Sequence, residues 1–339
     1  MENNKINQLL ELTSGNKDAI KETRYQDLDR LDWQKPYSIV FGVDGNFIRH
    51  ACITIQSMVE NAGAAQLSFH LITTEDTIDL ASKFQALVIN TPHSICIHRL
   101  SDSLFTNLPS TALFTKATYY RFLAPYLLEE EEAILYLDAD IVCINPFTDL
   151  FHKVKESEHI AFVVSELDHL TSTLAADVGL KEEKYFNAGM LMINVKSWRQ
   201  NFISEKALSL LETRGKDFRY LDQDALNVVL EGNVQFIDKK YNTLFMLGHS
   251  DVDYNRMPPN DTVFIHYAGA DKPWQKWNNQ AGTYFYTEHY QRSCWASYAF
   301  DMPKNDQQAK KMYKLLLREK KYFSSLQWYC MYIKLRYGK

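Results

Sequence analysis

The 339-residue sequence has little glycine or proline, no long apolar run and no excess of basic residues. With 12 Gly, 9 Pro and 46% hydrophobic residues, it lacks the composition of a disordered, collagen-like or low-complexity chain. A formal net charge of −5 argues against bulk nucleic-acid binding, for which a basic excess is expected. Because no apolar run reaches about 18 residues, no bilayer-spanning segment is predicted. The composition is that of a folded soluble protein.

The sequence also lacks the signals of several common classes of protein: zinc-binding, disulfide-exchanging, secreted and P-loop or dinucleotide-binding proteins. The five cysteines are scattered, and no Cys-x-x-Cys pair is present to hold zinc or exchange disulfides. Reduced thiols in a cytosolic protein are therefore expected. The start, MENNKINQLLEL, has no basic segment followed by an apolar core, so a secretory signal is not predicted. Neither a P-loop nor a G-x-G-x-x-G turn follows the first expected strand, which weakens both of those nucleotide-binding interpretations.

Short apolar runs instead alternate with helical patterns. The expected strands are 37–43, 67–72, 94–98 and 133–137, and helices are expected through Ile55 and Met58 and over about 117–128. This alternation predicts parallel β-α-β units in a doubly wound sheet. Ligands of such sheets bind at the carboxyl ends of strands, so polar residues that directly follow a strand are functional candidates.

The sharpest candidate is the pair Asp138 and Asp140, at the end of the apolar strand 133–137. Ionised carboxylates seldom lie against a core without a compensating cation. Oxygen ligands at this spacing suit Mg²⁺ or Mn²⁺, which would also bind a diphosphate. The alternative is that one Asp caps a helix beginning near Pro146 and the other is solvated.

A second cluster, His266 to Trp274, follows the expected strand 262–265. A neutral imidazole can complete a site begun by two carboxylates, and Mn²⁺ accepts such a mixed set. Gly269 permits close backbone approach to a ligand, and Lys272 can neutralise a phosphate. Taken alone, a histidine at a strand end is more often structural.

A third cluster, Tyr220 to Asn227, opens a helix that is expected to run to about Leu230. Acids in a first helical turn are favoured by the helix dipole, so Asp222 and Asp224 have a capping alternative. Gln223 has none, and its amide suits sugar hydroxyls or a developing positive centre.

Together with Val40–Phe47, Tyr119–Phe122 and Tyr185–Gly189, these clusters resemble glycosyltransferase family 8, the retaining sugar transferases of glycogenin type. The likeness is greatest to the bacterial lipopolysaccharide branch and runs from about Tyr37 to Trp277. It implies an α/β, GT-A type fold that is Rossmann-like, with a mainly parallel sheet flanked by helices.

The resemblance also implies roles for individual residues. The metal ligands, for Mn²⁺ or Mg²⁺, would be Asp138, Asp140 and His266. The nucleotide would be bound by Gly42, Asp44, Asn46, Phe47, Arg121, Asp138, Gly269 and Lys272. The donor sugar would meet Asn187, Asp222 and Gln223, of which Gln223 and Asp222 would be catalytic. A further carboxylate for the sugar hydroxyls is expected after the strand 160–164, but Glu166 and Asp168 both fit, and neither is assigned.

The implied reaction is transfer of glucose or galactose from UDP-glucose or UDP-galactose to the lipopolysaccharide outer core, with the α configuration kept. A front-face route is favoured, because an amide such as Gln223 is a poor nucleophile. One alternative is a family member acting on another acceptor, such as a capsule, glycoprotein or teichoic glycan. The other is a non-catalytic module that binds sugar nucleotides or glycans.

The tail is set apart by its charge. From Pro303 onward it carries about +8, whereas the remainder carries about −13. If 310–333 is mostly one helix, its basic and apolar residues fall on opposite sides, as in a helix at an anionic membrane surface. The alternative is a helical hairpin docked on the catalytic domain and bent near Ser324 and Ser325. The resemblance favours a peripheral protein on the cytoplasmic face of the inner membrane.

Three regions are therefore expected. Residues 1–36 form an N-terminal extension with a mixed-charge helical pattern, and residues 37–277 form the catalytic domain. Residues 278–339 form a basic, aromatic, helical region that associates with the membrane.

Overall fold

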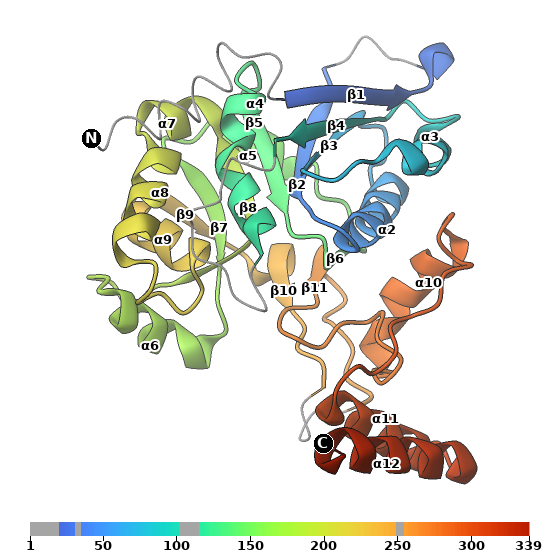
Figure 1. Ribbon diagram of the computed structural model, residues 1–339. Helices are drawn as coiled ribbons and strands as arrows, with labels where there is room; N and C mark the ends of the chain where they lie inside the picture. The colour runs from blue at the N-terminus through green and yellow to red at the C-terminus, as the bar shows by residue number, and fades with distance from the viewer. Residues whose placement is uncertain (1–19, 31–34, 102–114, 249–253, 339) are drawn as a thin grey trace.

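The computed structural model describes residues 20–30, 35–101, 115–248 and 254–338. Its centre is an eight-stranded sheet in the order β1-β4-β3-β2-β5-β8-β7-β9, beside a three-stranded sheet in the order β10-β11-β6 (Figure 1). The strands are β1 (Ile20–Gln26), β2 (Tyr37–Gly42), β3 (Leu67–Thr73), β4 (Ser94–Leu100), β5 (Ala133–Leu137), β6 (Ile141–Cys143), β7 (Ala161–Ser165), β8 (Phe186–Asn194), β9 (Val234–Ile237), β10 (Thr243–Leu244) and β11 (Phe264–His266). The helices are α2 (Phe47–Glu60), α3 (Ala81–Val88), α4 (Ala124–Leu127), α5 (Asp149–Lys155), α6 (Asp168–Val178), α7 (Val195–Gln200), α8 (Ile203–Arg214), α9 (Asp222–Val229), α10 (Tyr284–Arg292), α11 (Asp306–Arg318) and α12 (Tyr322–Tyr337).

The large sheet is mainly parallel, as predicted. Neighbours β4, β3, β2 and β5 run parallel, and so do β7 and β9, whereas β1 and β8 run antiparallel to their neighbours. The carboxyl ends of β2, β5 and β7 therefore lie along one edge, where β8 begins. The four strands expected early in the sequence are all present, as are the helix through Ile55 and Met58 and the helix that opens at Asp222.

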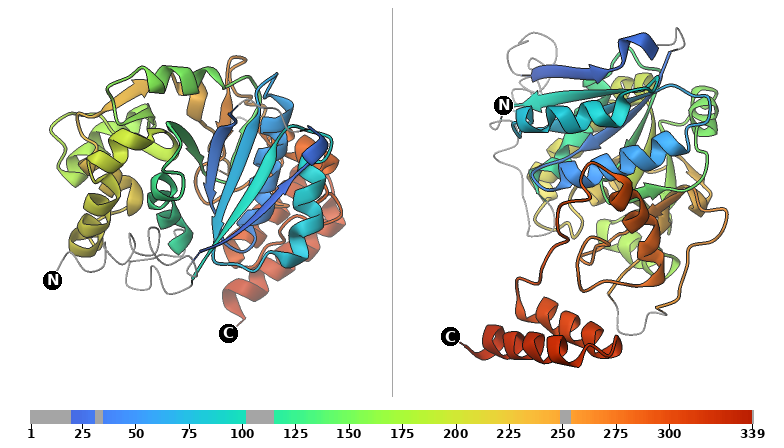
Figure 2. Two further views of the ribbon diagram at one scale, coloured as in Figure 1. Left: turned by 90° about the horizontal axis from the view of Figure 1, so that it is seen from above. Right: turned by 90° about the vertical axis from the view of Figure 1, so that its right-hand side faces the viewer.

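Alternate residues of the strands fill two hydrophobic cores, one on each face of the sheet. Residues of α2, α3, α5 and α10 pack on one face with side chains such as Phe41, Phe69 and Leu135. Residues of α6 to α9 pack on the other face with side chains such as Tyr136, Val163 and Leu191. Figure 2 shows the sheet between these helical layers. Fully buried parallel strands explain the nearly continuous apolar runs in the sequence.

Two local expectations are wrong. The mixed-charge pattern before Tyr37 contains a strand at Ile20–Gln26, not a helix; it adds to the sheet edge, antiparallel to β4. The helix expected over 117–128 is a 3-10 helix, η3 (Lys116–Phe122), followed by the single turn of α4. Pro125 is the second residue of that turn, where its missing N–H leaves no intrahelical bond unmade. Residues 1–19 and 31–34 of the expected extension lie outside the described residues.

The tail forms a helical hairpin and not one long helix. Helices α11 and α12 are joined at Lys320, which has a φ of 60°, and Lys321 N–H donates to the carbonyl of Leu316. The bend thus precedes Ser324 and Ser325, where the hairpin alternative placed it. Met312 and Leu316 pack on Trp277. Among the described residues, no helix is both long enough and apolar enough to cross a membrane.

Candidate active site and metal centre

The predicted metal ligands come from three elements that meet at one edge of the large sheet. Asp138 follows β5, and Asp140 lies between β5 and β6. His266 ends β11, which pairs with β6 so that His266 is opposite Ile141. The oxygen and nitrogen ligand atoms of the two aspartates and His266 all lie within 4.8 Å of one another. The structure thus brings together residues 128 positions apart in the chain, as the motifs predicted.

Two hydrogen-bond acceptor atoms of the candidate metal ligands face each other in an arrangement that suits a bound cation. The amide nitrogen of Asn242 donates to Asn187 Oδ1 at 3.0 Å, so the Asn242 oxygen faces His266 Nδ1, also at 3.0 Å. Because that oxygen can only accept, Nδ1 carries a proton, and Nε2 of the neutral ring is an acceptor. Nε2 faces Asp140 Oδ1 at 3.3 Å. That buried oxygen has no hydrogen-bond partner among the described residues. A divalent cation would satisfy both acceptors, so the donor set fits Mn²⁺ or Mg²⁺.

Two basic side chains balance the carboxylates. Lys272 Nζ donates to Asp140 Oδ2 and to the carbonyl of Tyr267. Burial raises the pKa of Asp140, but Lys272 and His266 outweigh burial and hold that pKa well below its usual range. Burial likewise lowers the pKa of His266, but Asp140 reverses the effect, so the pKa is raised overall. Metal binding must therefore displace a proton from His266 at acidic pH.

Gly189 gives His266 the space that it occupies. A Cβ atom on Gly189 would lie 2.3 Å from Cε1 of His266, far inside van der Waals contact. Gly189 also holds Asp138, whose backbone N–H donates to the Gly189 carbonyl at 2.8 Å. The glycine of the Tyr185–Gly189 motif is therefore a packing requirement of the metal centre.

Arg121 links the metal side of the site to the sugar side. Its Nη2 donates to Asp138 Oδ1 at 3.0 Å, and its Nε lies 3.0 Å from Asp222 Oδ2. Nη1 donates to the carbonyl of Ala188 at 2.6 Å. Burial raises the pKa of Asp222 to about 7, although Arg121 opposes that rise. One buried guanidinium thus orients two of the predicted site carboxylates.

The predicted sugar-side residues form one hydrogen-bonded group. Gln223 Oε1 accepts from the backbone N–H of Ala188 at 2.9 Å. Asn187 Nδ2 donates to Glu166 Oε2 at 2.9 Å, and Gln223 Nε2 lies 3.4 Å from the same oxygen. Asp224 accepts from the Tyr185 hydroxyl and, at 2.7 Å, from the Tyr220 N–H, so it has a structural role.

The structure distinguishes the two carboxylates that follow β7. Glu166 is buried and bonded to Asn187, whereas Asp168 is exposed and pairs with Lys239. Of the two carboxylates that the sequence left unassigned, Glu166 is thus the one that contacts the candidate sugar-side residues Asn187 and Gln223. Asn242, which orients His266, was missed altogether, because it lies in the 3-10 helix η4 (Lys239–Asn242), where no motif marks it.

The remaining predicted nucleotide-binding residues lie around the same edge. Gly42 ends β2, where a Cβ would lie 2.8 Å from the Ala117 carbonyl oxygen. The exposed Phe47 ring meets the edge of Trp274, with centroids 5.9 Å apart, and Gly269 turns the chain after β11 with a φ of 87°.

Asp44 and Asn46 lie in the turn before α2. No hydrogen bond or ion pair within the described part of the chain joins their side chains to the acidic cluster. Their predicted contact with the nucleotide stays a prediction.

A mainly parallel α/β sheet with paired carboxylates and an imidazole at its ligand-binding edge defines a GT-A type nucleotide-sugar transferase. Residues 38–278 match Glycosyl transferase family 8, and residues 281–336 match its C-terminal region. The chain belongs to this family, and it is a hexosyltransferase.

Curated relatives agree over nearly the whole length. The chain is 32% identical to a lipopolysaccharide 1,3-galactosyltransferase of Salmonella typhimurium, over 88% of this chain and 90% of that protein. It is 29% identical to a lipopolysaccharide 1,2-glucosyltransferase of Escherichia coli, over the same shares.

Solved structures support the fold. The galactosyltransferase LgtC, solved with donor and acceptor sugar analogues, superposes with a TM-score of 0.63 at 23% identity, covering 76% of this chain and 96% of its own. The predicted GT-A type fold is thereby confirmed.

Proposed function

We propose that the protein transfers glucose or galactose from the corresponding UDP-sugar to the lipopolysaccharide outer core, with retention of the α configuration and with Mn²⁺ or Mg²⁺. The observation that carries the donor chemistry is the pair of acceptors, Asp140 Oδ1 and His266 Nε2, that face each other at 3.3 Å. The acceptor class is supported by relatives that are named for lipopolysaccharide and match 88% of the chain.

The chain supplies the surroundings for a departing diphosphate. Asp138, Asp140 and His266 would hold the divalent cation, whose chemistry is to offset the negative charge that grows on the UDP leaving group. Lys272 and Arg121 bring fixed positive charge to the same edge, and both are already oriented by hydrogen bonds to the aspartates. Charge placed before the reaction costs no reorganisation when the bond breaks.

The hydrogen bonds of Gln223 favour the front-face route. Its amide oxygen accepts from the Ala188 N–H, and this hydrogen bond lowers the electron density that an already weak nucleophile could offer to an anomeric carbon. We infer that Gln223 instead shields or stabilises the face opposite the acceptor. Asn187 and Glu166 would bind donor hydroxyls, because their amide and carboxylate groups converge on the same place.

Turnover of a UDP-sugar tests this proposal. The purified protein is incubated with UDP-glucose or UDP-galactose, truncated lipopolysaccharide and Mn²⁺, and UDP release is measured. We expect Asp140→Asn to reduce kcat by about 10³-fold, since a bound cation contributes several kcal/mol to such steps.

Asp149→Asn is the matched control, because Asp149 is a half-exposed carboxylate paired with Lys153 away from the site. Nucleotide binding without turnover on any acceptor would favour the non-catalytic module. Turnover only on another glycan would overturn the acceptor assignment.

We further propose that the tail holds the enzyme at the cytoplasmic face of the inner membrane. Helix α12 exposes large apolar side chains around much of its circumference: Tyr322, Phe323, Leu326, Tyr329, Met331, Ile333, Leu335 and Tyr337. Basic residues flank them, among them Lys321, Lys334 and Arg336. Such a surface suits the interface of a lipid bilayer, where acyl chains lie beneath anionic headgroups.

Vesicle flotation tests the membrane proposal. We expect binding to vesicles with anionic lipid, weaker binding to neutral vesicles, and loss of binding in Phe323→Glu/Leu326→Glu. The control is Ile78→Glu, because Ile78 is as exposed as Phe323 (76% each) but lies far from the tail in the sequence. Equal binding by the tail variant and the control would contradict the proposal.

A further inference from the structure

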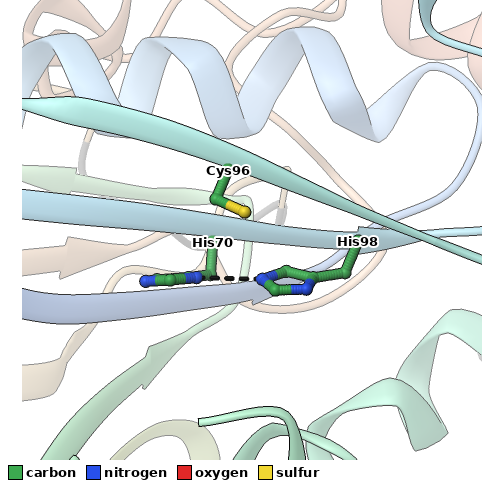
Figure 3. A group of neighbouring side chains, drawn as sticks. All are labelled: His70, Cys96 and His98. Atoms are coloured by element: carbon green, nitrogen blue, oxygen red, sulfur yellow. Dashed lines mark hydrogen bonds between the residues drawn. The ribbon is translucent and has the colours of Figure 1, made fainter. Parts of the chain in front are cut away.

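A second cluster of metal-ligating side chains lies on β3 and β4, away from the donor site. His70 is on β3, directly opposite Cys96 of β4, and His98 is two residues further along β4 on the same face of the sheet. One ligand atom from each of the three residues lies within 4.8 Å of the others. In Figure 3 the Cys96 sulfur points toward the space between the two imidazole rings.

Hydrogen bonds already set the orientation of His70. Its Nε2 lies 3.0 Å from Ser68 Oγ, which accepts from Ser94 Oγ at 3.1 Å. Its Nδ1 faces His98 Nε2 at 2.9 Å. A metal-binding histidine typically donates its second ring N–H to an oxygen in this way, which leaves the first nitrogen free to coordinate.

We propose that His70 Nδ1, Cys96 Sγ and His98 Nε2 bind a zinc ion. Two imidazoles and a thiolate are the ligand set that Zn²⁺ accepts, and they differ from the oxygen-rich set of the donor site. Tetrahedral zinc with such bonds separates its ligand atoms by about 3.3–3.8 Å. The ligand atoms of the cluster are near enough that side-chain rotations alone would reach this geometry.

The surroundings fit a bound ion of this charge. The three side chains are at most 4% exposed, so a bound ion would be shielded from water. Glu22 of β1 pairs with His98 across the strands and is hydrogen-bonded to Cys96. Its carboxylate lies outside the group of ligand atoms within 4.8 Å of one another, so the half-exposed Glu22 side chain would have to turn inward to supply a fourth ligand.

Arg24 is the charged partner of Glu22, with its Nη2 3.5 Å from Glu22 Oε1. Zinc with one thiolate and one carboxylate is neutral, so Arg24 would be left as a single half-exposed cation. With Glu22 as a ligand, the ion would join β1 to β3 and β4. The site is therefore structural, and it would fasten the antiparallel strand at the edge of the sheet.

Cobalt substitution tests the proposal on the full-length protein. A thiolate bound to Co²⁺ gives a charge-transfer band in the near ultraviolet, and the donor site contains no sulfur ligand. We expect this band in the wild-type protein and in Asp140→Asn, with zinc displacing the cobalt. We expect its loss in Cys96→Ala and in His98→Asn, with zinc affinity reduced at least about tenfold, as for loss of a metal-site partner.

Two other cysteine variants serve as controls. Cys330 is exposed and Cys52 is buried elsewhere, so Cys330→Ser and Cys52→Ala are expected to keep the band. A wild-type protein without the band overturns the proposal even if the variants do not fold. A band that is lost with Cys330 or survives in Cys96→Ala overturns it as well.

Discussion

The candidate ligands at the end of β5 and those in the middle of β3 and β4 lie in different surroundings. Near the end of β5, Asp140 and His266 are buried but Asp138 is partly exposed, whereas His70, Cys96 and His98 are all buried. Asp138, Asp140 and Asp222 are carboxyl groups in direct contact with the cations Arg121 and Lys272. His70 and His98 are held neutral by burial and bonded to each other. The arrangement of the cluster at the end of β5 therefore depends on charge balance and on pH. The arrangement of the cluster on β3 and β4 depends instead on close packing.

The largest expected difference is in the pH dependence of stability. The pKa of Asp222 is raised from 3.8 to about 7 in the folded chain, so its contribution is most favourable below pH 4 and is lost as pH rises through 7. The stability of the wild type relative to Asp222→Asn should therefore fall between pH 4 and 7, by on the order of 4 kcal/mol. Urea denaturation across this range measures it. Parallel pH curves for the two proteins would contradict the assignment.

Removal of a charge partner should have the next largest effect. Lys272→Met leaves Asp140 without its ammonium partner, and we expect a loss of about 3 kcal/mol in the free energy of unfolding in EDTA. Mn²⁺ should restore most of it, because the ion replaces the missing charge. Lys153→Met is the control, since its ion pair is half exposed and is worth under about 1 kcal/mol. An equal loss in both variants would show that Asp140 does not need Lys272.

A methyl group added at Gly189 should have a smaller effect, confined to metal binding by Asp138, Asp140 and His266. The added methyl of Gly189→Ala displaces His266, and we expect Mn²⁺ affinity to fall by roughly 100-fold. The cobalt band assigned to Cys96 should be unchanged. In Gly63→Ala, a Cβ meets no neighbour, although the φ of 60° strains an alanine there; calorimetric titration should still give wild-type Mn²⁺ affinity. Unaltered Mn²⁺ binding in Gly189→Ala would separate His266 from the metal.

The smallest expected effect separates the two carboxylates after β7. Glu166→Gln weakens the contact to Asn187, and we expect kcat/KM for the UDP-sugar to fall about tenfold. Asp168→Asn removes only an exposed pair with Lys239, and donor kinetics should stay within about twofold. The opposite result would make Asp168 the donor-sugar carboxylate.

The sequence was sufficient for the sheet and most of the site, for a physical reason. Buried parallel strands give apolar runs, and Asp138, Asp140 and His266 directly follow or end such runs. Glu166 could not be assigned because the β7–β8 register shifts between Val163 and Val164, so residue alternation cannot be followed through the strand.

Other features depend on contacts that no local pattern encodes. Strand β1 is polar because it lies at the edge of the sheet, and its pattern of charged residues resembles that of an exposed helix. The pairing of His70 with Cys96 requires the register between two strands, which spacing along the chain does not give. A cluster of this kind has no Cys-x-x-Cys pattern, so the sequence gives no sign of it.

The contacts of Arg121 with both Asp138 and Asp222 affect which residues can be changed to alter the preference for a donor sugar. Because one guanidinium contacts both Asp138 and Asp222, exchange of Asp222 would disturb the cation as well as the sugar. Asn187 is likewise tied to the metal side, because it accepts from Asn242, which orients His266. Attempts to alter the choice between epimeric donors should therefore begin with Glu166, whose carboxylate among the described contacts bonds only to Asn187, Gln223 and the Leu167 N–H.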